Sequence, residues 1–134
     1  MEIKHRAFWF PGVLPDPRLL ANRRGRQSHW AQRAGPTKAA RQEARSLLLA
    51  EGPFERAVDG CYEVDWTAHY PEHRGAPDSD AIASALKPFM DAVVDVGLLR
   101  DDGPKTVRRV SYAVVGKSPK GTGLELVIRQ VARL

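Results

Sequence analysis

The sequence predicts a single α+β domain in which two helices cover one face of a mixed four-stranded sheet. A length of 134 residues suits one domain with its own core, and 43% hydrophobic with 28% charged residues is the composition of an ordinary globular protein. Strand-like and helix-like segments follow in the order strand, helix, strand, helix, strand, strand, with no internal repeat. We therefore expect one domain over residues 1–134 with the order β-α-β-α-β-β.

The first half of the chain contains two expected strands and one expected helix. Residues 2–10 are rich in aromatic residues and predict a strand, and the prolines that follow end it. Residues 19–30 have no clean period and predict a loop. Residues 38–51 are strong helix formers, with Thr37 as the expected N-cap. Residues 62–70 alternate apolar and polar side chains, as in an antiparallel strand with one buried side.

The second half predicts a helix followed by two strands. An apolar stripe at helical spacing follows Asp80, and Gly97 is well placed to cap the end of that helix. Pro88 predicts either a kink or a helix that begins near Ser84. Residues 106–115 and 124–131 predict two strands, which a glycine-rich loop would join in a long hairpin.

Charge is unevenly distributed. The chain carries a net charge of +5, and the segment from Arg18 to Arg45 has eight basic residues and one acid, so the remainder is net acidic. A concentrated basic segment favours a polyanionic partner over a merely solvated helix face. The candidate DNA-binding residues are Asn22, Arg23, Arg24, Arg26, His29, Lys38, Arg41 and Arg45. Arginines in this segment could clamp phosphates, and the last three residues continue the basic stripe onto a helix.

Composition also bounds the location of the protein. No run is apolar enough for a membrane span, and the N-terminus lacks the pattern of a secretory signal. The single Cys61 excludes an internal disulfide, and no Cys/His spacing suggests zinc. These features favour a cytoplasmic protein without membrane partners.

Acidic residues flank the second helix. Asp78 and Asp80 precede it, and Asp101 and Asp102 follow it. Each pair has a structural explanation, because Asp favours N-caps and turns. If the fold instead brings both ends together, the carboxylates would hold a hard cation such as Mg²⁺. Lys87 would then stabilise the negative transition state of phosphodiester hydrolysis.

This pattern resembles the RusA family of Holliday junction resolvases. The matching residues are Asp78, Asp80, Lys87, Asp91, Gly97, Asp101 and Asp102, together with the basic segment and the final strands, so the resemblance covers nearly the whole chain. Its most specific part is the spacing from Lys87 to Asp102. The chain departs from the family at Ala81, where an Asn is usual.

The resemblance implies a RusA-like fold and a homodimeric endonuclease that resolves four-way DNA junctions by paired symmetric cuts. It implies Mg²⁺ as the cofactor, with Mn²⁺ as a substitute. Asp78, Asp80 and Asp102 would be catalytic metal ligands, Asp101 a supporting carboxylate and metal ligand, and Lys87 a catalytic cation. One alternative is a weakened or inactive relative that binds branched DNA without cutting it. Another, which the basic segment disfavours, is a metal-dependent phosphohydrolase for small substrates.

Overall fold

The sheet is built around β2, whose residues Cys61–His69 lie between two neighbouring strands. The computed structural model describes residues 5–20, 30–55 and 58–132, without the side chains of residues 30–33. The elements follow in the order β1 (His5–Pro11), η1 (a 3-10 turn, Pro17–Leu19), α1 (Trp30–Ala50), β2, α2 (Ser79–Asp95), β3 (Val107–Val115) and β4 (Gly123–Val131). The predicted class and element order are therefore confirmed. None of the described helices is long and apolar enough to cross a membrane.

The strand order is β1-β4-β2-β3, so the predicted hairpin between the last two strands is wrong. β3 pairs with β2 in parallel, β4 pairs with β2 antiparallel, and β1 pairs with the far edge of β4. A parallel pair needs a long crossover connection, which α2 supplies between β2 and β3. β2 therefore hydrogen-bonds along both edges and separates two strands that are consecutive in sequence.

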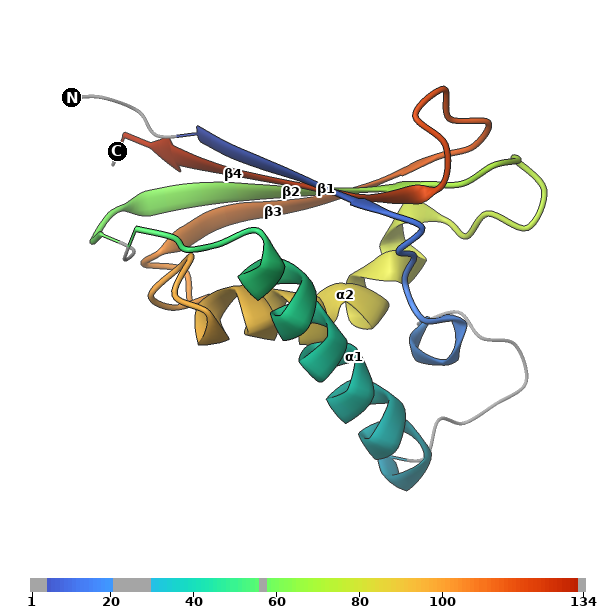
Figure 1. The fold of residues 1–134 in the computed structure, drawn as a ribbon, viewed down its shortest axis with the longest axis horizontal. Helices are drawn as coiled ribbons and strands as arrows, with labels where there is room; N and C mark the ends of the chain where they lie inside the picture. Colours follow the sequence, from blue (N-terminus) through green and yellow to red (C-terminus); the bar gives the residue numbers. More distant parts are fainter. Residues whose placement is uncertain (1–4, 21–29, 56–57, 133–134) are drawn as a thin grey trace.

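Both helices cover the same face of the sheet, as predicted (Figure 1). Trp66 in the middle of β2 is fully buried, and its ring meets Phe89 of α2 edge-on at 5.2 Å between centroids. Leu126 of β4 lies opposite Trp66 and is also fully buried. Each such side chain contributes roughly 1.5–3 kcal/mol through burial, so this layer between sheet and α2 holds the fold together.

The helix ends differ in part from expectation. α1 begins at Trp30 and contains Pro36, so the predicted start at Thr37 is wrong. α2 runs through Pro88 from Ser79, which excludes a start near Ser84. The predicted cap at Gly97 is confirmed, because Gly97 has a φ of 87° and its N–H donates to the carbonyl of Val94, while the N–H of Leu98 donates to that of Val93. These two bonds form a Schellman motif, which turns the chain back towards β3.

Candidate functional site

Lys87 lies between two carboxylates on the exposed side of α2. Its Nζ is 2.6 Å from Oδ2 of Asp102 and 3.2 Å from Oδ1 of Asp91. Asp91 is one helical turn further along α2, whereas Asp102 belongs to the loop between α2 and β3. The fold therefore brings together the two ends of the most specific part of the predicted motif, Lys87 and Asp102.

The loop that carries Asp102 is shaped by its neighbours. Oδ1 of Asp101 accepts a hydrogen bond of 2.8 Å from the backbone N–H of Asp102. A Cβ at Gly103 would lie 2.8 Å from Oδ2 of Asp101, so a larger residue there would displace the Asp101 side chain. Asp101 thus orients the backbone of Asp102, and its expected role as a supporting metal ligand stays a prediction.

The ion pair changes the proton affinity of both partners. The hydrogen bond from Lys87 lowers the pKa of Asp102, and the same bond raises the pKa of Lys87. Tyr112 of β3 lies nearby: burial raises its pKa, and the charge of Lys87 partly offsets that shift. The Lys87 side chain is 60% exposed, so its ammonium group can be reached by a ligand.

Asp78 and Asp80 occupy the other end of α2. Asp78 is the N-cap residue, with an extended backbone and no side-chain capping bond, and Asp80 lies in the first turn. Both are exposed, and neither side chain forms a hydrogen bond or ion pair within the described part of the chain. From Asp80 to Lys87 the helix rises about 10.5 Å at 1.5 Å per residue. The two acidic pairs therefore flank α2 rather than meeting.

The structure does not assemble the predicted ligand set of Asp78, Asp80, Asp101 and Asp102. Across residues 5–20, 30–55 and 58–132, no group of three or more His, Cys, Asp or Glu side chains is placed to hold a metal ion. The donor chemistry nevertheless suits Mg²⁺, which prefers oxygen ligands and is often held by one or two carboxylates together with substrate phosphates. Asp102, with Asp101 beside it, offers such carboxylates next to a cation.

The basic segment has two parts with different outcomes. Asn22, Arg23, Arg24, Arg26 and His29 lie outside the described residues. On α1, Lys38 is exposed without an ion-pair partner in the described part of the chain.

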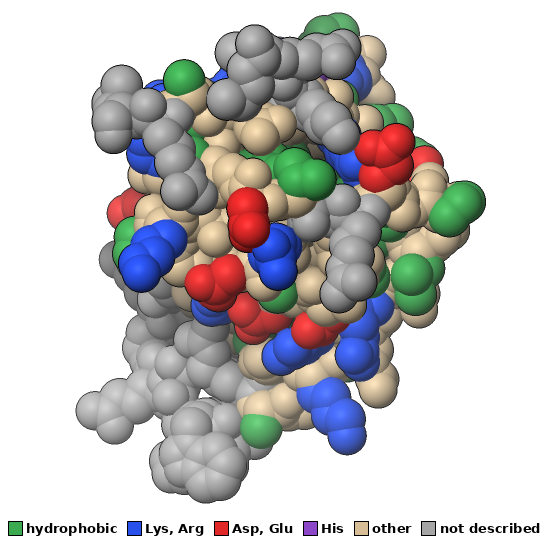
Figure 2. All heavy atoms as spheres, turned by 90° about the vertical axis from the view of Figure 1, so that its left-hand side faces the viewer, with side chains coloured by type: hydrophobic (Ala, Val, Ile, Leu, Met, Phe, Trp, Pro, Cys, Tyr) green, Lys and Arg blue, Asp and Glu red, His purple; other side chains and the backbone are tan. Residues whose placement is uncertain are grey.

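Arg41 and Arg45 instead face α2. Arg41 forms two hydrogen bonds of 2.7 Å with the Asp95 carboxylate and lies 3.9 Å from Asp91, and Arg45 lies 3.9 Å from Asp95. Figure 2 shows basic and acidic side chains interspersed on the end of the molecule where α2 stops. Both arginines therefore pair with acids of α2 and tie the two helices together, a role that the sequence did not reveal because Arg41 and Asp95 are 54 positions apart.

A second missed feature lies on the sheet face that no described helix covers. Glu63 of β2 is only 9% exposed because arginines of both neighbouring strands surround it. Arg108 donates to its carboxylate at 2.8 Å, and Arg129 lies 3.4 Å away. The alternation of residues 62–70 placed Glu63 on the polar face, but only the strand order reveals these partners.

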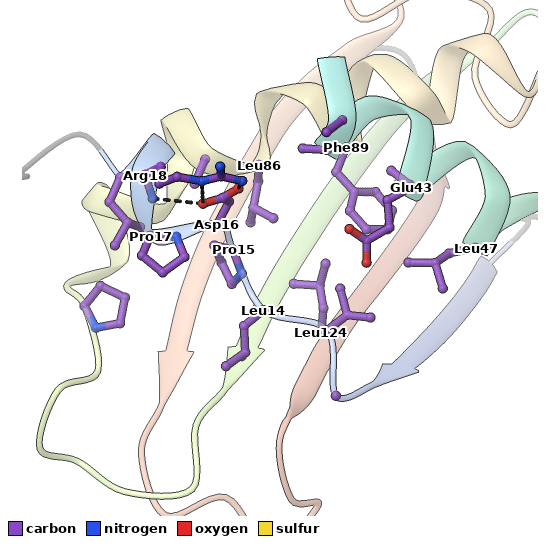
Figure 3. A pocket seen from close by; sticks show the side chains of 18 of the residues that line it. Leu14, Pro15, Asp16, Pro17, Arg18, Glu43, Leu47, Leu86, Phe89 and Leu124 are labelled. Carbon is purple, nitrogen blue, oxygen red and sulfur yellow. Dashed lines mark hydrogen bonds and ion pairs between the residues drawn. The ribbon is translucent and has the colours of Figure 1, made fainter. Parts of the chain in front are cut away.

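A pocket of about 490 Å³ lies between α1, the middle of α2 and the segment after β1 (Figure 3). Leu86, Phe89 and Leu124 form apolar walls, and the Asp16–Arg18 ion pair lies at its edge with 2.8 Å between Nη2 and Oδ2. Lys87 and Asp102 do not line it. The pocket is therefore separate from the candidate active site.

Comparisons with known proteins add no assignment. No family model matches the chain, and no curated protein matches it significantly. The function is therefore inferred from the residue pattern and from the geometry around Lys87 and Asp102.

Proposed function

We propose that this protein is a RusA-like, Mg²⁺-dependent endonuclease that cuts four-way DNA junctions. The contact of 2.6 Å between Lys87 and Asp102 carries the proposal, because it joins the two residues whose spacing is most specific to the resemblance. The α+β fold with this element order is also what the resemblance implies.

The residues of the chain have distinct roles in this proposal. Lys87 is an exposed cation that can bind a phosphate oxygen and stabilise the charge that develops during cleavage. Asp102 presents a carboxylate held ionised by Lys87, and Asp101 fixes the backbone beneath it. Asp101 and Asp102 are the carboxylates that would hold Mg²⁺ together with a substrate phosphate, and the metal would supply polarisation of the phosphate and activation of water.

Branched DNA and a second copy of the chain are the proposed partners. Two symmetric cuts require two equivalent sites, and a two-fold homodimer supplies them. We place the protein in the cytoplasm of a bacterial cell, where recombining DNA would be its substrate.

The test is incubation of the protein with an end-labelled four-way junction, in Mg²⁺ or in EDTA, beside a linear duplex of the same sequence. We expect paired nicks in the junction only with Mg²⁺, and an intact duplex. Cleavage that persists in EDTA would contradict the proposed cofactor, and equal cutting of both substrates would contradict the proposed substrate.

A second candidate function is branched-DNA binding without cleavage. Two observations favour it: the four acidic residues are not assembled into one ligand set, and Ala81 replaces the usual Asn and is buried. Specific junction binding without nicks in Mg²⁺ or Mn²⁺ would select this alternative.

A further inference from the structure

Two loops lie side by side at the end of the sheet where α2 begins (Figure 1). They are the β2–α2 loop (residues 70–77) and the β3–β4 loop (residues 116–122). Tyr70 donates its N–H to the carbonyl of Val115 at 2.8 Å, and Ser118 donates its N–H to the carbonyl of Tyr70 at 3.2 Å. A Cβ on Gly116 would lie 2.9 Å from Cα of His73, so only glycine allows this close approach. The loops therefore form one joint surface.

Buried His69 at the end of β2 anchors the β3–β4 loop. Its Nε2 lies 3.0 Å from Oε1 of Glu125, and its Nδ1 lies 2.6 Å from Oγ of Ser118. The backbone N–H of Lys120 donates to the same Oγ at 3.2 Å. The Lys120 ammonium lies 4.7 Å above the Trp9 ring and 3.4 Å from Oε2 of Glu125. The loop thus holds a cation in a defined place instead of leaving it on a mobile tip.

The joint surface carries cations that the rest of the fold does not neutralise. Arg74 and Lys117 are exposed and have no ion-pair partner within the described part of the chain. Glu72 is the one acid within these two loops. Lys117 has a φ of 51°, a left-handed conformation that residues other than glycine seldom adopt. The anchored loop therefore fixes the backbone position of Lys117.

We propose that these two loops bind the phosphate backbone of a DNA arm through Arg74 and Lys117. The inference rests on the proposed function and deepens it. It assigns DNA contact to the two loops and not to Arg41 and Arg45, which pair with acids of α2. Lysine and arginine contacts to phosphates are independent of base sequence and position the protein on the duplex. A DNA arm lying on the loops would pass the start of α2, which follows the first loop directly.

The test compares three single variants by the salt dependence of junction binding. Lys117→Asn removes the charge and keeps a residue that tolerates the left-handed conformation, and Arg74→Gln removes the second cation. Lys105→Gln is the matched control, because Lys105 is also exposed without an ion pair in the described part of the chain but precedes β3 at its opposite end. The slope of log association constant against log salt concentration is about −0.9 for each phosphate contact. Each loop variant should therefore have a slope that is shallower by about 0.9 than that of the wild type.

The control variant should keep the wild-type slope, and all three variants should keep the wild-type melting temperature. Equal slopes in Lys117→Asn, Arg74→Gln and Lys105→Gln would overturn the loop surface, even if the wild-type protein nicks junctions. A wild-type protein that binds junctions without nicking them, while the loop variants lose slope, would support the loop surface and leave only the cleavage proposal refuted.

Discussion

At the scale of single residues, Lys87 is the centre of the candidate site. It contacts Asp91 through helical spacing and Asp102 through the path of the loop after α2. The first contact follows from sequence, since residues four apart share a helix face. The second needs the Schellman turn at Gly97 and the burial of Leu98 and Leu99, which direct the loop back along the helix.

Replacing Lys87 should change the titration of Asp102. Lys87→Met keeps a similar length and removes the donor, so we expect the pKa of Asp102 to rise towards the ordinary value of about 3.9. Carboxyl NMR titration measures this, with Lys105→Gln as the control. An unchanged Asp102 titration would show that the ion pair does not form in solution.

The sign of this shift also fixes its effect on stability. Because the pKa of folded Asp102 is lowered, its ion pair contributes fully above the ordinary carboxyl pKa. That contribution is lost as pH falls through the lower, folded value. In Lys87→Met this part of the acid dependence should be absent.

The ligand set shows where residue-level prediction stops. Sequence identified Asp78, Asp80, Asp101 and Asp102 as carboxylates flanking one helix. Whether they meet depends on how far the returning loop extends along α2, and here it reaches Lys87 rather than the first turn. A long-range path of this kind leaves no periodic signal in the sequence.

At the scale of elements, composition and periodicity together predicted the four strands and both α-helices of the described chain. Pairing was harder to predict. The last two strands are consecutive, which favours a hairpin, yet β2 is inserted between them. β2 pairs with β4 along one edge and with β3 along the other, and neither pairing can be predicted from the order of the strands in the sequence. The start of α1 was also missed, because Gly35 and Pro36 signal a boundary that the helix passes through.

The packing of α1 can be tested with adjacent leucines. Leu48 is fully buried in the core, whereas Leu49 is 62% exposed. Leu48→Ala should lower the free energy of unfolding by about 2–5 kcal/mol, because it removes buried contacts and leaves a cavity. Leu49→Ala should change it by less than about 0.5 kcal/mol. Denaturant unfolding measures both, and equal losses would mean that α1 does not dock through this face.

At the scale of the whole molecule, some basic side chains are ion-paired within the fold, whereas others are exposed to a ligand. Arg41 and Arg45 of α1 pair with acids at the end of α2, while Arg74 and Lys117 are exposed at the other end of the sheet without an ion-pair partner among the described residues. The sequence gives a net charge of +5. It could not show which cations are already paired, because pairing depends on contacts across the fold.

The most direct test of the proposed active site is the Asp102→Asn variant on a labelled four-way junction in Mg²⁺. Asn keeps the shape of the side chain and removes its charge, so junction affinity should stay within a few-fold of wild type. Nicking should fall by at least about 100-fold if Asp102 takes part in the chemistry. Asp65→Asn is the control, because Asp65 is also ion-paired with a basic side chain, Arg129 at 2.7 Å, and lies on β2 away from the site. Nicking by Asp102→Asn at the rate of wild type and Asp65→Asn would contradict the account.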